Sequence, residues 1–67
     1  MNVWKLRAVM GERGITQYQL AKAIGCGNNT FSDKMNGRRD FKLGEVKRIC
    51  EVLAITEPAQ IVEIFLE

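Results

Sequence analysis

Four polar side chains between positions 28 and 33 have the chemistry needed to bind the edges of DNA bases. Asn28 and Asn29 carry amides, and an Asn amide forms two hydrogen bonds with an adenine. Asp33 offers an acceptor for the amino group of cytosine, and Ser32 offers a hydroxyl. On a helix, Ser32 and Asp33 follow the asparagines by about one turn, so all four share one face. This spacing predicts a helix that reads bases in a DNA groove.

Groups suited to phosphate flank this run on both sides. Arg38 and Arg39 follow it in an expected loop, and arginine binds phosphate oxygens. Gln17 precedes it, at the first position of another expected helix, where free backbone N–H groups suit a phosphate oxygen. Base contacts flanked by phosphate contacts are typical of a DNA-binding surface.

The same side chains also allow simpler structural roles. Asn28 can cap a helix, while Asn29 and Asp33 can be solvated surface residues that bind no ligand. Arg38 and Arg39 can form a loop that only faces solvent. These alternatives stay open at the level of the sequence.

Residues for catalysis or metal binding are scarce. The chain has no histidine, the usual general base at neutral pH. Its two cysteines, Cys26 and Cys50, form no CxxC pair, and no other cluster has the spacing of a zinc site. The glycines match no phosphate-binding loop. We therefore expect no enzyme, no catalytic residue, no metal and no cofactor.

The distribution of charge favours a polyanionic partner. Residues 1–48 contain all ten lysines and arginines and four acidic residues, a net charge of +6. Residues 49–67 contain four glutamates and no basic residue, a net charge of −4. A basic body with an acidic end predicts that one side binds the polyanion while the other faces away.

The length of 67 residues corresponds to one small domain, so we expect residues 1–67 to form a single DNA-binding unit. The N-terminal stretch lacks the apolar core of a signal peptide, and no run approaches the roughly 18 apolar residues of a membrane span. We expect a cytoplasmic protein with reduced cysteines and no membrane partner.

Apolar periodicity predicts five helices and no strands, so the expected fold class is all-α. The first helix is expected at residues 2–12, where the apolar residues repeat with helical spacing. Its stripe consists of Val3, Leu6 and Met10, widened by Trp4 and Ala8. A fourth helix is expected at about 42–54, and a fifth begins near Pro58, which suits a first helical turn. Phe41 is expected to insert into the core.

The segment 16–37 predicts two short helices joined by a tight turn. Thr16 and Gln19 have the spacing of a capping box, which starts the first of them. The glycines of Gly25-Cys26-Gly27 end it, because glycine adopts positive φ without strain. The second helix, at about 28–36, is polar except for a seam of Phe31 and Met35. Helices joined so closely cross steeply, so the second stands out as a rod that fits the major groove.

The stretch TQYQLAKAIGCGNNTFSDKMNG is similar to the helix-turn-helix of the phage Cro/repressor (Xre-like) family. The matching marks are Thr16-Gln17, Leu20-Ala21, the turn at Gly25, Phe31 and Asn36-Gly37. The resemblance implies a compact five-helix lambda-repressor-like domain with its helix-turn-helix at about 16–37. It also implies a transcriptional repressor that binds a double-stranded DNA operator as a homodimer.

The resemblance further implies roles for individual side chains. The base-contacting residues would be Asn28, Asn29, Ser32 and Asp33. The phosphate-contacting residues would be Gln17, Thr30, Lys34, Arg38, Arg39 and Arg13. Two positions depart from the family pattern, because Gly27 and Lys42 replace residues that usually cap the third and fourth helices. With glycine at position 27, the cap of the third helix is either weakened or moved to Asn28.

The apolar tail is a candidate dimer contact. Ile64, Phe65 and Leu66 can join two copies of the chain, or they can close the core of one copy. Two other functions stay open on the same fold. One is a protein-interaction module or antitoxin-like regulator, and the other is a DNA binder without sequence preference.

Overall fold

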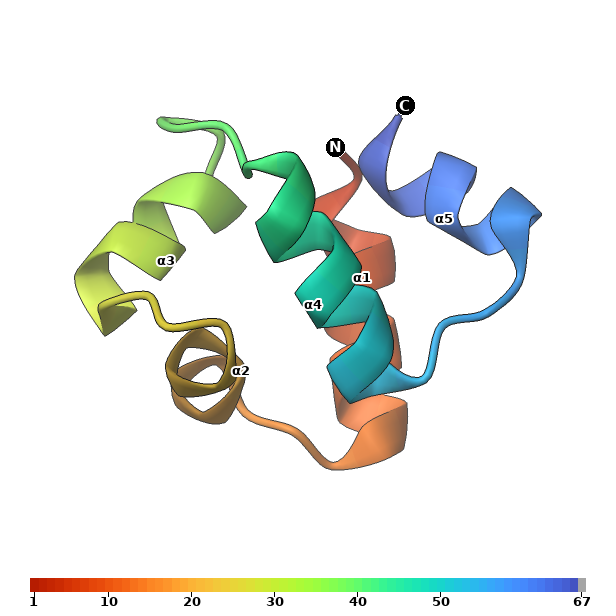
Figure 1. Cartoon of the computed structure of the whole chain (residues 1–67), viewed down its shortest axis with the longest axis horizontal. Coiled ribbons are helices and arrows are strands. Elements are labelled where there is room, and N and C mark those ends of the chain that lie inside the picture. Colours follow the sequence, from red (N-terminus) through yellow and green to blue (C-terminus); the bar gives the residue numbers. More distant parts are fainter. Residues whose placement is uncertain (67) are drawn as a thin grey trace.

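The computed structural model describes residues 1–66, and within them the chain forms five α-helices and no strand. The helices are α1 (Val3–Arg13), α2 (Gln17–Ala23), α3 (Asn28–Met35), α4 (Leu43–Leu53) and α5 (Pro58–Phe65). In Figure 1, α2 and α3 lie to the left, α4 crosses the middle in front of α1, and α5 lies to the right. The all-α prediction is confirmed, and each helix lies close to its expected bounds.

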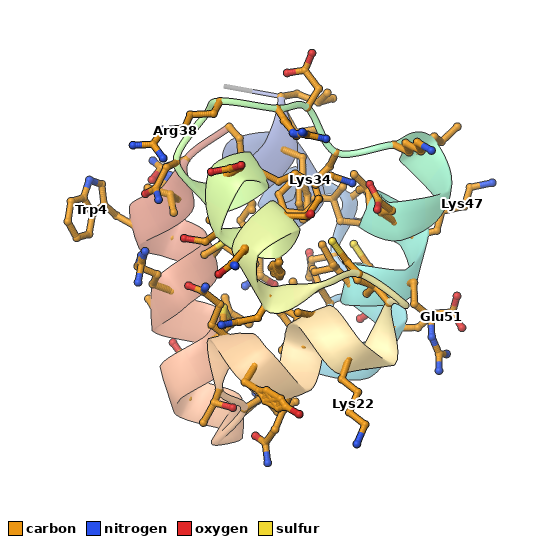
Figure 2. The ribbon with its side chains drawn as sticks, turned by 90° about the vertical axis from the view of Figure 1, so that its left-hand side faces the viewer. Trp4, Lys22, Lys34, Arg38, Lys47 and Glu51 are labelled. Carbon is orange, nitrogen blue, oxygen red and sulfur yellow. The ribbon has the colours of Figure 1, made fainter. Side chains whose placement is uncertain are left out.

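The first helix buries a narrower stripe than the sequence pattern predicted. Leu6, Val9 and Met10 are buried, but Trp4 is 78% exposed and Ala8 is exposed as well. At 100° per residue, Trp4 and Ala8 fall on the face opposite Leu6. The prediction that these two residues widen the apolar stripe was therefore wrong, and Trp4 projects from α1 into solvent (Figure 2).

The start of α2 is fixed by the predicted capping box. The Gln19 N–H donates to the Thr16 hydroxyl at 3.1 Å, and the Thr16 N–H donates to Gln19 Oε1 at 2.9 Å. These bonds satisfy two backbone donors at the helix end. After α2, Gly25 has φ 76°, a conformation that side chains disfavour. The glycine therefore permits the sharp turn that leads into α3.

The core is a cluster of apolar side chains contributed by all five helices. Phe31 of α3 is fully buried and meets Phe41 edge-on, with ring centroids 5.5 Å apart. The expected insertion of Phe41 is confirmed, because this ring is half-buried against the cluster. The other fully buried large side chains are Leu6, Leu20, Met35, Ile49, Leu53 and Ile64.

The C-terminal helix closes the core against α1. Ile64 is only 1% exposed, and its carbonyl accepts a hydrogen bond from the Asn2 N–H at 2.6 Å. Of the three tail residues considered as dimer contacts, Ile64 is therefore excluded, because its side chain has no surface to offer. Phe65 is half-buried and Leu66 is exposed.

No helix among residues 1–66 is long and apolar enough to cross a membrane.

Candidate nucleic-acid interface

The second and third helices form one side of the molecule. Leu20 and Ala21 of α2 and Phe31 and Met35 of α3 are all buried between the two helices and the core. Ala21 is small, which permits close packing at this crossing. Figure 2 looks onto this side and shows the opposite face of α3 turned outward.

The N-terminal turn of α3 presents its polar residues to solvent. The N-cap position is Gly27, which makes no side-chain capping bond, and the helix begins at Asn28. The alternative that Asn28 caps α3 was therefore wrong. Both Asn28 and Asn29 are exposed. Their amides, together with the first-turn backbone N–H groups, form a polar tip at the end of the helix.

The next turn of α3 is tied to the loop that follows it. Ser32 and Asp33 are half-buried. The Arg38 guanidinium lies 3.3 Å from the Asp33 carboxylate, and the Arg38 N–H donates to the Asp33 carbonyl at 2.9 Å. Exposed pairs of this kind contribute little stability, so Arg38 can exchange this partner for a phosphate. Asp33 thereby holds a cation at the C-terminal edge of the α3 face.

The other flanking groups lie around the same helices. Gln17 is half-buried at the first position of α2, and Thr30 is half-buried in the first turn of α3. Arg39 is exposed in the loop after α3 and forms no ion pair with the residues that the structure describes. Gln17 and Thr30 thus lie in the first turns of α2 and α3, and Arg38 and Arg39 lie in the loop that follows α3.

Lys34 does not face the outward side of α3, so its position gives no support to the phosphate contact expected for it. Its side chain points inward between α3 and α4 (Figure 2), and the residue is only 8% exposed. Its ammonium lies 2.6 Å from both carboxylate oxygens of Glu45 on α4. An ammonium held this way is not available to a duplex. Moving it outward would leave the Glu45 carboxylate without its partner.

The carboxylate of Glu45 has a second role at the start of α4. Its Oε1 accepts from the Lys42 N–H at 2.8 Å, which is one half of a capping box, while the Lys42 side chain makes no capping bond. The hydrogen bond from Lys34 lowers the pKa of Glu45 below its ordinary value of 4.5, and the Lys42 N–H lowers it further. Glu45 is therefore an anion at neutral pH, paired with the one buried lysine.

Arg13 serves the scaffold at the far end of α4. Its Nε donates to the Leu53 carbonyl at 2.8 Å, which satisfies a carbonyl of the last turn of α4. This end of α4 is opposite to the end that follows the α3–α4 loop. The structure thus places Arg13 apart from Arg38 and Arg39, and it does not bring Arg13 to the α3 face.

Two side chains beside the tip of α3 were not predicted from the sequence. Tyr18 and Lys22 of α2 are exposed, and together with Gly27 and Asn28 they line a shallow hollow of ≈ 310 Å³. The signal was present in their spacing, because positions four apart share one face of a helix. An aromatic ring and an ammonium at this place extend the polar surface from α3 onto α2.

A family model for the Cro/C1-type HTH DNA-binding domain matches residues 5–67 of the chain. No curated protein and no solved structure matched the chain. The family match begins two residues inside α1, covers the other four helices and includes every side chain discussed in this subsection.

Proposed function

Because the chain belongs to the Cro/C1-type helix-turn-helix DNA-binding family, we propose that it is a sequence-specific transcriptional regulator that reads duplex operator DNA with α3. The observation that carries the proposal is the two-sided character of α3. Phe31 and Met35 anchor one face in the core, while Asn28 and Asn29 project from the other. A helix so exposed fits the major groove, where amides distinguish base pairs.

Each polar group around α3 has a proposed part in binding. Asn28, Asn29, Ser32 and Asp33 contact base edges. Gln17, Thr30, Arg38 and Arg39 hold phosphates and set the register of the helix in the groove. By occupying an operator, the protein represses the promoter that overlaps it.

In vitro selection of bound DNA from random duplexes tests the proposal. We expect a short consensus to be enriched, and we expect its affinity to fall steeply as salt rises, because phosphate contacts release counterions. Selection that enriches no sequence, with equal affinity for all duplexes, would show a DNA binder without sequence preference. Failure to bind any duplex at low salt would favour the protein-interaction module.

We further propose that the protein binds its operator as a homodimer through a groove between α4 and α5. The groove has a volume of ≈ 470 Å³ and is mainly apolar. Its apolar walls come from Phe41, Leu43, Val46, Ile61, Phe65 and Leu66. Leu43 and Leu66 are 71% and 75% exposed, so two apolar side chains project at the edge of the groove.

A second copy of this chain fits the groove because the same surface contains both projecting leucines and the groove that can receive them. A two-fold contact brings the same patch of both copies together, so the leucines of one copy can enter the groove of the other. The groove also has charges of both signs nearby. Asp40 lines it, and Lys42 lies in the chain between two residues that line it. The molecule measures 28 × 23 × 20 Å, so two copies in contact can place their α3 helices about 34 Å apart, one turn of DNA.

A further inference from the structure

We infer that Lys34 and Glu45 are positioning residues that hold α3 at the angle needed to read bases, an inference that rests on the function proposed above. Neither side chain touches the DNA in this arrangement. They act through the residues that do, because Lys34 directly follows Asp33 in the same helix.

Lys34 and Glu45 form the only buried ion pair among residues 1–66. The side chains of Lys34 and Glu45 are 9% and 17% exposed, whereas each side chain of the pairs Lys5–Glu63, Arg38–Asp33 and Arg48–Glu51 is at least 35% exposed. Burying a lysine and a glutamate carries a large desolvation cost, which apolar residues at both positions would avoid. Because a buried pair adds little net stability, the role assigned to this one is to specify the geometry of the contact between α3 and α4.

Several contacts converge on the pair from the elements around it. The Lys34 ammonium lies 6.0 Å from the centre of the Phe41 ring, which itself packs on Phe31 of α3. Glu45 is held by the Lys42 N–H at the start of α4. The ammonium of α3 is therefore directed at a carboxylate whose own position is fixed.

The pair supplies a directional contact where the rest of the α3 packing is apolar. Apolar contacts of Phe31 and Met35 are non-directional and allow the helix to rotate or slide slightly. Two hydrogen bonds to one carboxylate restrict both motions. A rotation of α3 would displace Ser32 and Asp33 from the base edges, because these side chains project from the same turn as Lys34.

Two variants and a matched control test the inference. Lys34→Met keeps an apolar stem but removes the ammonium, and the double variant Lys34→Met/Glu45→Gln leaves no unpaired charge in the core. The control, Lys5→Met/Glu63→Gln, removes an exposed pair that joins α1 to α5 at 3.4 Å. Circular dichroism checks that each variant is folded, and affinities are measured for the selected operator and for a scrambled duplex over a range of salt.

We expect the ratio of the two affinities to fall by about tenfold in both Lys34 variants, which is the discrimination of roughly one good base contact. The affinity for the scrambled duplex and the slope of log affinity against log salt should stay unchanged. The control should change none of the three quantities.

Two results would overturn the inference while leaving the proposed function intact. A slope reduced by about one, with the ratio preserved, would mean that Lys34 contacts phosphate directly. If the affinity ratio and the salt slope of the variants both equalled those of the wild type, the pair would be a scaffold contact without a role in base reading. A wild-type protein that prefers no duplex would overturn the proposed function, and the positioning role with it.

Discussion

At the scale of single residues, neighbours on α3 have different environments. Asn29 is exposed, Asp33 is paired with the Arg38 guanidinium, and Lys34 is buried against Glu45. The direction in which each side chain leaves the helix decides this outcome, since adjacent residues are 100° apart. The polar character of α3 is therefore divided between a solvent-facing side and a side that packs on the scaffold.

The division between base reading and phosphate binding predicts different effects for two exposed residues. Asn29→Ala should relax the base preference at one position of the operator by about 1–3 kcal/mol, because two hydrogen bonds to one base are lost. Arg38→Ala should weaken binding to all duplexes alike and reduce the salt slope by about one. Selection and salt titration of each variant measure the two effects.

The control for these variants is Lys47→Ala, which removes an exposed cation of α4 at the edge of the view onto α3 (Figure 2). It should alter neither the consensus nor the salt slope. Equal losses across all sequences for Asn29→Ala and Arg38→Ala would contradict the assignment of Asn29 to a base.

The paired carboxylate of Glu45 predicts how stability depends on pH. Its pKa in the folded protein lies below 4.5, so folding favours the ionised form. The stabilisation is complete above the unfolded pKa and is lost as pH falls through the folded pKa. The difference in unfolding free energy between the wild type and Glu45→Gln should therefore be largest near neutral pH and should shrink on acidification. Urea unfolding from about pH 7 to about pH 3 measures it, and a difference independent of pH would contradict the pairing.

At the scale of the elements, the helix-turn-helix has one well-capped helix and one poorly capped helix. Thr16 and Gln19 cap α2 reciprocally, whereas Gly27 offers α3 no side-chain oxygen. A weak cap leaves the N–H groups of the α3 tip free for another acceptor. The same feature that weakens α3 in isolation therefore suits a helix that meets a polyanion.

The missing cap predicts a stabilising substitution. Gly27 has φ −65° and ψ 148°, which any residue can adopt, and a Cβ there would meet only the Thr30 hydroxyl oxygen at 4.0 Å. Gly27→Ser should raise the unfolding free energy by about 0.5–1 kcal/mol through the new cap and a less flexible unfolded chain. Thermal unfolding should show an increase of a few degrees.

The matched control for this substitution is Gly25→Ser in the same turn. Because Gly25 has φ 76°, serine there should lower the unfolding free energy by about 1 kcal/mol. If both serines destabilised the protein equally, the absence of a cap at position 27 would not be the limiting feature of α3.

At the scale of the whole molecule, the candidate DNA-binding and dimer surfaces lie on different parts of the globule. The first is formed by α2 and α3, and the second by the groove between α4 and α5. Figure 1 shows α3 and α5 on opposite sides of α4. A second copy can therefore occupy the groove without covering the face of α3.

The proposed dimer predicts that charged residues in the groove separate the copies. Leu66→Asp and Leu43→Asp should shift the protein to a monomer and weaken operator binding, because a carboxylate would be buried in an apolar contact. Val62→Asp is the control, since Val62 is also exposed on α5 but does not line the groove. Sedimentation of each variant with and without operator measures the state. A wild type that stays monomeric on its operator would refute the dimer.

Much of the architecture followed from the order of residues. The capping box at Thr16 and the glycine turn at Gly25 act through bonds and backbone angles only a few residues apart. The seam of Phe31 and Met35 on α3 followed in the same way. Such local signals do not depend on what the rest of the chain does. The helices and the exposed face of α3 could therefore be predicted, and the family resemblance was confirmed by the match to residues 5–67.

Only the tertiary structure decided which residues leave the surface. Lys34 belongs by type to a basic DNA-binding set, yet it lies against Glu45, eleven positions away on another helix. Ile64 belongs by type to an apolar tail that could join two copies, yet its side chain is buried in the core beside α1. Trp4 was expected on the buried stripe of α1, yet its side chain is exposed. These outcomes depend on how helices cross, and a crossing is a property of pairs of distant surfaces that no local pattern encodes.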